Sequence, residues 1–310
     1  MIQDIAPHRL NNQYDVKIQA KPEDPVYCFR KDELLVKEAD GGNISLPKVN
    51  DFPPGSSFRY VFAVDGHPYF LYKKPAESLG SLIDKALSEE DIYYETGSDS
   101  KEEVAGREDL SYVRLQTLRE NLPVRVEKWQ YFAAITAFHL FEWYEGSRFC
   151  GRCGHKTIHS ETERCMICPQ CGNHIYPKIV PAVIVGVTNN DKLLVTRYAR
   201  RPIGYDALVA GFTEIGETVE ETVAREVKEE TGLNVKNIRY YKSQPWGMVS
   251  DVLMGFYCDV DGDDTVHLDG ELGQALWLTA DRIKGQPDDM SLTNEMMMYF
   301  KKQHLKGATV

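Results

Sequence analysis

Hydrophobic and polar side chains alternate in two stretches near the start of the sequence, at residues 26–37 and 58–73. This alternation predicts β-strands with one buried face, and an Asp-Gly pair inside the second stretch predicts a hairpin turn. At residues 126–145 the apolar positions recur at helical spacing, and Gly146 follows as a stop signal. The pattern therefore predicts a strand-rich N-terminal domain that ends in a helix.

The last part of the sequence alternates between segments typical of strands and segments typical of helices. Short apolar runs predict strands at residues 181–187, 192–198, 206–212, 252–260 and 274–279. A helix is expected from Thr218 to Thr231, closed by Gly232, and a second one at residues 294–303. The sequence therefore predicts a C-terminal domain of mixed strands and helices, which makes the whole protein α+β.

A cluster of cysteines separates these two regions. Cys150 and Cys153 form one Cys-x-x-Cys pair, and Cys168 and Cys171 form a second pair after fourteen residues. Two such pairs can place four thiolates around a zinc ion in a closed, structural site. A redox dithiol is the alternative. The spacing predicts a structural zinc ribbon.

The second pair could be drawn differently, because Cys165 and Cys168 also form a Cys-x-x-Cys. This choice would leave Cys171 outside the site. Gly172 after Cys171 repeats the glycine after Cys153, as in two equivalent knuckles. We therefore expect Cys168 and Cys171 to be the ligands.

Three glutamates recur on one face of the helix expected from Thr218 to Thr231. Glu226, Glu229 and Glu230 stand at positions i, i+3 and i+4, so their carboxylates repel one another. Hard divalent cations such as Mg²⁺ and Mn²⁺ relieve this repulsion, because they prefer carboxylate oxygens and bridge to phosphates. For such a run taken alone, a solvated helix with ordinary charge pairs is the alternative.

The longer pattern around these glutamates favours the metal site. Gly211 is followed after five residues by Glu217, and after seven more by Arg225 and the glutamates, with a Gly-aliphatic pair at the end. The pattern resembles the Nudix box at every fixed position. The resemblance covers residues 176–310 and implies a mixed sheet between helices, in an enzyme that hydrolyses nucleoside diphosphates linked to another moiety.

The same resemblance implies roles for the residues of the box. Glu226 and Glu230, with Glu229 nearby, would hold Mg²⁺ or Mn²⁺, which can neutralise a pyrophosphate and acidify the attacking water. Glu217 and Arg225 would pair and brace the loop against the helix. Glu229 is one candidate for the general base, although the carboxylate that serves as base varies among Nudix enzymes.

A zinc ribbon directly before a Nudix domain is similar to the NADH pyrophosphatase family. This similarity implies three parts: a strand-rich N-terminal domain at residues 1–145, the ribbon at 146–175 and the Nudix domain at 176–310. It implies that Tyr176 and Phe212 stack on nucleotide bases, although core packing is the alternative for both. It further implies metal contacts from Glu271 and from the carbonyl of Ala210.

The segment after the box follows the family only in part. Ser243-Gln244-Pro245-Trp246 keeps the first half of the family's Ser-Gln-Pro-Trp-Pro-Phe-Pro-x-Ser signature, which implies that Gln244, Pro245 and Trp246 contact substrate. Gly247 to Val249 and Asp251 then depart from it. Arg119 matches a substrate-contacting arginine, with an ordinary surface arginine as the alternative.

Composition limits the classes of function. With 42% hydrophobic and 27% charged residues, the chain has the composition of a folded globular protein. The net charge of −11 disfavours sequence-independent nucleic-acid binding, which depends on lysine and arginine. The first residues do not have the pattern of a secretion signal, and no apolar run is long enough to span a membrane. We therefore expect a cytoplasmic protein without a membrane segment.

The expected function is hydrolysis of NADH or NAD to nicotinamide mononucleotide and AMP, with Mg²⁺ or Mn²⁺ as catalytic metal and structural Zn²⁺. By resemblance, removal of NAD caps from RNA and a homodimeric state are also expected. The alternative is a Nudix hydrolase for ADP-ribose or a nucleoside triphosphate. A binding adaptor built on the ribbon is a third hypothesis, and it would not need the carboxylate helix.

Overall fold

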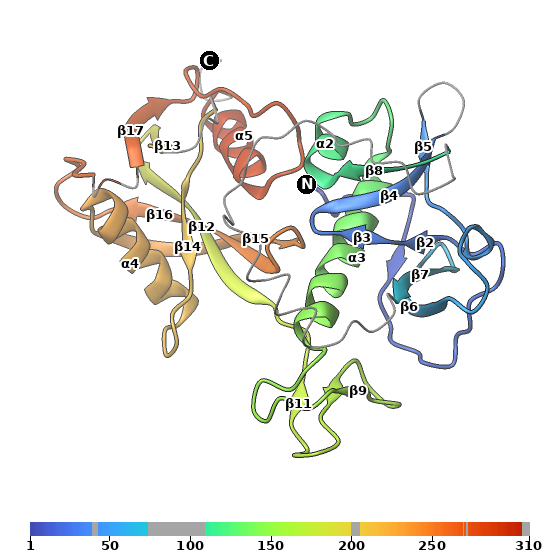
Figure 1. The fold of residues 1–310 in the computed structure, drawn as a ribbon. Coiled ribbons are helices and arrows are strands. Elements are labelled where there is room, and N and C mark those ends of the chain that lie inside the picture. The colour runs from blue at the N-terminus through green and yellow to red at the C-terminus, as the bar shows by residue number, and fades with distance from the viewer. Residues whose placement is uncertain (39–42, 74–108, 200–204, 269, 271, 306–310) are drawn as a thin grey trace. The chain divides into compact units, whose positions relative to one another are not determined.

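The computed structural model describes residues 1–38, 43–73, 109–199, 205–268, 270 and 272–305 (Figure 1). Glu271 lies outside these residues. The chain forms two compact units, one made of Ile5–Pro177 and the other of Met1–Asp4 together with Lys178–Val310. None of the described helices is long and apolar enough to cross a membrane.

Ahead of the cysteine segment, the described residues of the Ile5–Pro177 unit form two small sheets and two α-helices. One sheet has the order β1 (Leu10–Asn11), β6 (Ser57–Val64), β7 (His67–Lys73) and β2 (Val26–Tyr27). The other contains β3 (Phe29–Arg30), β4 (Glu33–Glu38) and β5 (Ile44–Ser45), and β8 (Leu110–Arg114) pairs with β4. A 3-10 helix, η2 (Val49–Asp51), and the α-helices α2 (Leu115–Glu120) and α3 (Lys128–Gly146) complete this part.

The hairpin predicted in the second alternating stretch is confirmed. β6 and β7 pair antiparallel, and Asp65 and Gly66 between them have φ values of 52° and 81°. Positive φ at both central residues suits the right-handed twist of a tight hairpin, which explains the choice of Asp-Gly. The helix predicted at residues 126–145 is confirmed as α3, which begins two residues later and includes Gly146.

The cysteine segment forms a three-stranded sheet with the order β11 (His174–Ile175), β10 (Met166–Ile167) and β9 (Ile158–His159). Its strands are only two residues long, so their backbone hydrogen bonds alone cannot stabilise the segment. A metal or packing against the neighbouring strands must add to its stability.

The second unit is built on one mixed sheet. Its main path is β15 (Val235–Trp246), β16 (Asp251–Val260), β12 (Val180–Asn189), β13 (Lys192–Tyr198) and β17 (Leu272–Thr279), and β14 (Val209–Phe212) pairs with β12. β12 and β16 are parallel, whereas the other pairs are antiparallel. The mixed sheet predicted from the Nudix resemblance is therefore confirmed.

A helix covers each face of this sheet (Figure 1). Alternate residues of β12 explain this arrangement. Val183, Val185 and Val187 point to the core shared with α4 (Val219–Thr231), whereas Ile184 points to the core shared with α5 (Leu292–Leu305). Since both faces of β12 are buried, its sequence is a continuous apolar run.

The long strand β15 was not predicted. Most of its side chains are exposed, and polar residues such as Lys236, Arg239 and Lys242 interrupt any apolar run. The strand is defined by its pairing with β16, which extends from Val235 opposite Val260 to Trp246 opposite Asp251. Local sequence gave no signal because an edge strand of this kind is specified by its partner.

Candidate active site

The local sequence fixes both ends of α4, the helix that carries the glutamates. The Thr218 hydroxyl accepts a hydrogen bond from the Glu221 backbone N–H at 3.2 Å, and the Glu221 carboxylate accepts one from the Thr218 N–H at 2.7 Å. This reciprocal capping box satisfies donors that the first turn leaves free. Gly232 ends the helix with a φ of 75°, a conformation that glycine adopts without strain.

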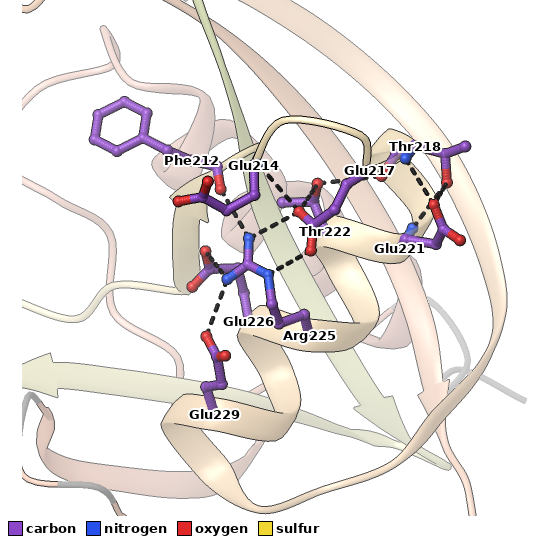
Figure 2. Close-up of polar contacts among 9 residues, drawn as sticks. All are labelled: Phe212, Glu214, Glu217, Thr218, Glu221, Thr222, Arg225, Glu226 and Glu229. Carbon is purple, nitrogen blue, oxygen red and sulfur yellow. Dashed lines mark hydrogen bonds and ion pairs between the residues drawn. The ribbon is translucent and has the colours of Figure 1, made fainter.

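Arg225 and Glu217 hold the preceding loop against this helix (Figure 2). The Arg225 Nε and Nη2 atoms donate to the two Glu217 oxygens at 2.6 and 2.9 Å. Glu217 also accepts from the Glu214 N–H at 3.1 Å and from the Thr222 hydroxyl at 3.0 Å. The pairing with Arg225 is the main reason that the pKa of Glu217 falls to about 2. The pair expected from the sequence is present, and Thr222 is a supporting residue that the sequence analysis missed.

The same guanidinium contacts two of the three helical carboxylates. Arg225 Nη1 donates to Glu226 at 2.8 Å and to Glu229 at 2.9 Å, and Nη2 donates to the Phe212 carbonyl oxygen at 2.9 Å. These hydrogen bonds, with that to Glu217 the largest, raise the pKa of Arg225. Arg225 therefore connects the loop, the end of β14 and the carboxylate face of α4 (Figure 2).

Glu226 lies directly against the backbone of β14. A Cβ atom built on Gly211 would lie 2.0 Å from Glu226 Cδ, so only glycine leaves room for this carboxylate. The Glu226 side chain is 12% exposed, and burial raises its pKa although Arg225 opposes this change. The contact with Glu226 thus explains why the box requires glycine at position 211.

The three carboxylates differ in their access to solvent. Glu230 is 3% exposed, whereas the Glu229 side chain is 57% exposed. Glu226 and Glu230, one turn apart, therefore form the buried part of the acidic face. Carboxylate oxygens are the ligand type that Mg²⁺ and Mn²⁺ prefer, so the chemistry of these side chains fits a divalent cation. Ala210, whose carbonyl was a predicted metal ligand, precedes Gly211 in β14.

We expect Gly211→Ala to lower kcat by about 10²-fold, because the new methyl group displaces the Glu226 carboxylate and small misplacements of catalytic groups carry losses of this size. Steady-state NADH hydrolysis with Mn²⁺ would measure the change. Gly146→Ala is the matched control, since a Cβ there meets no atom within 4 Å. Equal activity of the two variants would contradict the steric argument.

Two predicted substrate-binding residues, the base-stacking candidate Phe212 and the substrate-contact candidate Trp246, lie at one end of the sheet. Phe212 ends β14 opposite Ala182 of β12, and Trp246 ends β15 opposite Asp251, which itself pairs with Val180 of β12. Phe212 is 52% exposed, as a stacking surface requires. The register therefore brings both aromatic residues to the end of the sheet where Gly211 and Glu226 lie.

The other substrate candidates have different environments. Gln244 is fully buried, and its amide donates to the Met290 carbonyl oxygen at 2.7 Å and accepts from the Leu292 N–H at 2.8 Å. A substrate contact through this amide would require these hydrogen bonds to break. Pro245, the next residue, is exposed.

Two candidates belong to the first unit. Tyr176 is 54% exposed, and its hydroxyl donates to Glu163 at 3.1 Å. Arg119 lies in the last turn of α2. Any ligand contact by Tyr176 or Arg119 would therefore be made by the first unit.

The four predicted cysteine ligands converge within the first unit. Their Sγ atoms all lie within 4.8 Å of one another, with Cys153 at 3.4 Å from both Cys168 and Cys171, and Cys150 at 3.7 Å from Cys171. Four sulfurs at 2.3 Å from a zinc ion would be roughly 3.8 Å apart, so the geometry fits tetrahedral zinc. Within the described part of the chain, no other group of three or more such donors is this close.

The knuckle geometry distinguishes between the two possible second pairs, Cys168 with Cys171 and Cys165 with Cys168. Gly154 N–H donates to the Cys150 carbonyl oxygen at 2.8 Å, and Gly172 N–H donates to that of Cys168 at 2.9 Å. The two turns are therefore equivalent. Cys165 is fully buried outside the cluster, with its thiol 3.4 Å from the Met166 carbonyl oxygen.

Comparison with known proteins agrees with this geometry. Residues 178–298 match the NUDIX domain family model, so the sheet, α4 and the first half of α5 form a Nudix domain. Residues 147–176 match the NADH pyrophosphatase zinc ribbon domain. The chain thus combines a Nudix domain with the zinc ribbon of the NADH pyrophosphatases, which confirms the resemblance drawn from the sequence motifs.

Individual relatives cover part of the chain. This chain is 41% identical over 144 residues to NAD-capped RNA hydrolase NudC from Shigella dysenteriae serotype 1. The matched segment is 46% of this chain and 56% of that protein. With the NudC of an Enterobacter species it shares 42% identity over 142 residues, 46% of this chain and 55% of the relative. The matched segment thus spans little more than half of these relatives.

Among solved structures, a NUDIX hydrolase from Nitrosomonas europaea is 25% identical, with a TM-score of 0.45 over 51% of this chain and 93% of that chain.

Proposed function

We propose that this protein hydrolyses the pyrophosphate of NADH and NAD, releasing nicotinamide mononucleotide and AMP, and that it also removes NAD caps from RNA. The observation that carries the proposal is the carboxylate face of α4, with Glu230 buried, the Glu226 side chain only 12% exposed, and Arg225 linking Glu226 to Glu217. The ribbon match and the relatives named NAD-capped RNA hydrolase NudC support NAD as the substrate class.

In this proposal Glu226 and Glu230 hold Mg²⁺ or Mn²⁺, with Ala210 and Glu271 as further ligands. The cation, when bound, would neutralise the pyrophosphate and acidify a water. Glu229, the exposed carboxylate, is our candidate for accepting the proton of the attacking water as the P–O bond to the leaving phosphate breaks. Arg225 positions Glu229 through its hydrogen bond of 2.9 Å.

The aromatic residues supply the substrate contacts in the proposal. Phe212 and Trp246, at one end of the sheet, present rings to the bases of the dinucleotide. Tyr176, Pro245 and Arg119 are proposed to add contacts. We further propose a cytoplasmic homodimer, from the cysteine-rich site and the family resemblance, with zinc held by the ribbon.

A substrate panel tests the proposed activity. We expect AMP release from NADH to exceed release from ADP-ribose and from dinucleoside polyphosphates, with Mg²⁺ or Mn²⁺ present and none with EDTA. Chromatography of the nucleotide products measures all reactions at once. Faster turnover of ADP-ribose or a nucleoside triphosphate would favour the second candidate function, which the departure at Gly247 to Val249 supports.

A further inference from the structure

Four basic side chains converge in the first unit, where β6 and β7 lie near the ribbon segment. Arg59 and Lys73 share one face of the β6–β7 hairpin, because Ser57 is opposite Lys73 and Arg59 is opposite Leu71. Lys156 and Arg164 come from the ribbon segment. Lys73 and Lys156 are exposed, and Arg59 and Arg164 are half-buried. We call Arg59, Lys73, Lys156 and Arg164 the cationic cluster.

Aromatic rings and backbone oxygens hold the two arginines. The Arg59 guanidinium lies 3.9 Å from the centroid of the Tyr144 ring, and that of Arg164 lies 5.3 Å from the Tyr14 ring. Arg164 also donates to the carbonyl oxygens of Asn12 at 3.0 Å and Val61 at 2.8 Å. These contacts fix both guanidinium groups and leave their charge uncompensated.

No carboxylate pairs with the cluster among the residues that the structure describes in this unit. Glu145 contributes only a weak attraction to Arg59, and its own ion pair is with Arg148 at 3.4 Å. Adjacent cations without counter-charges repel one another, so the cluster favours an anion from outside.

The positive charges of the cluster also affect the pKa values of neighbouring titratable groups. Burial lowers the pKa of Lys73, and the charges of Arg59 and Lys156 lower it further. Burial likewise lowers the pKa of His159 to about 3, and the charges of Arg59, Lys73 and Arg164 add to this effect. His159 is therefore neutral at pH 7, so it adds no charge to the cluster.

We propose that the cationic cluster binds the phosphate backbone of the RNA that carries an NAD cap; the choice of ligand rests on the proposed function. Several cations spread over two chain segments match a polyanion with phosphates in series. The net charge of −11 would otherwise repel RNA, so a local reversal of sign is needed. The exposed ammonium groups of Lys73 and Lys156 would contact phosphates directly.

The test compares Lys73→Gln/Lys156→Gln with Lys17→Gln/Lys21→Gln, which removes two exposed lysines from the same unit. Fluorescence anisotropy would measure the Kd for a single-stranded RNA of about 20 nucleotides over a series of salt concentrations. We expect the first variant to bind on the order of tenfold more weakly, and its log Kd to change less steeply with log salt, by about 1.4. The control should bind like the wild type.

NADH hydrolysis by the same proteins separates this inference from the proposed function. We expect kcat/KM for NADH to be unchanged in both variants, whereas KM for NAD-capped RNA rises only in Lys73→Gln/Lys156→Gln. Absence of RNA binding by the wild type, equal affinities of the two variants, or displacement of RNA by millimolar inorganic phosphate would each overturn the inference. Absence of NADH hydrolysis, with RNA binding retained, would overturn only the proposed function.

Discussion

Glu230→Gln is expected to lower kcat/KM for NADH by about 10³-fold, because the amide keeps the shape of the side chain and removes the charge that a divalent cation needs. Glu230 is 3% exposed, so a solvent-facing carboxylate of the helix cannot take its buried position without rearrangement. Steady-state kinetics with Mg²⁺ and Mn²⁺ would measure the loss. A titration with Mn²⁺ followed by electron paramagnetic resonance should show weaker binding in parallel.

Glu220→Gln is the control for this prediction. Glu220 lies in the first turn of the same helix and is exposed, so its loss removes the same charge away from the buried face. We expect the control to keep wild-type kinetics and wild-type affinity for Mn²⁺. Full activity of Glu230→Gln would exclude Glu230 from the catalytic centre, and it would revive the hypothesis of a binding adaptor.

Cys171→Ser is expected to release zinc and unfold the ribbon segment. The strands β9, β10 and β11 are each two residues long, so the metal, with a binding free energy on the order of 10 kcal/mol, must supply much of the order. Elemental analysis should find about one zinc ion per chain in the wild type and almost none in the variant. Limited proteolysis should then cleave within residues 147–176.

Cys165→Ser provides the comparison for the ribbon. Cys165 is fully buried within the same segment, but its thiol lies outside the four-sulfur cluster. We expect this variant to keep its zinc, with a modest loss of thermal stability from burying a hydroxyl. Loss of zinc from Cys165→Ser and retention in Cys171→Ser would show that Cys165, and not Cys171, is the zinc ligand.

The best sequence predictions concern features that short segments specify alone. Helix α4 has its capping threonine, its closing glycine and its carboxylate spacing within fifteen residues, so the helix and its acidic face could both be predicted. The Asp-Gly hairpin and the two zinc knuckles are local in the same sense. In each case, a few neighbouring residues determine the backbone conformation.

Features that depend on a distant partner could not be predicted in this way. β15 is a strand because β16 pairs with it, and Gln244 is buried because Met290 and Leu292 supply its hydrogen bonds. The steric need for glycine at position 211 exists only because the Glu226 side chain packs on that strand.

The sequence by itself determined the Nudix helix, the cysteine knuckles and the class of chemistry, because spacing along the chain is enough to specify a cap, a turn or one face of a helix. Only the tertiary structure decided that Glu230 is buried and that Arg225 connects Glu217, Glu226 and Glu229. It also decided that Arg59, Lys73, Lys156 and Arg164 form one cluster. These outcomes depend on distances between residues far apart in the chain, and those distances are set by packing.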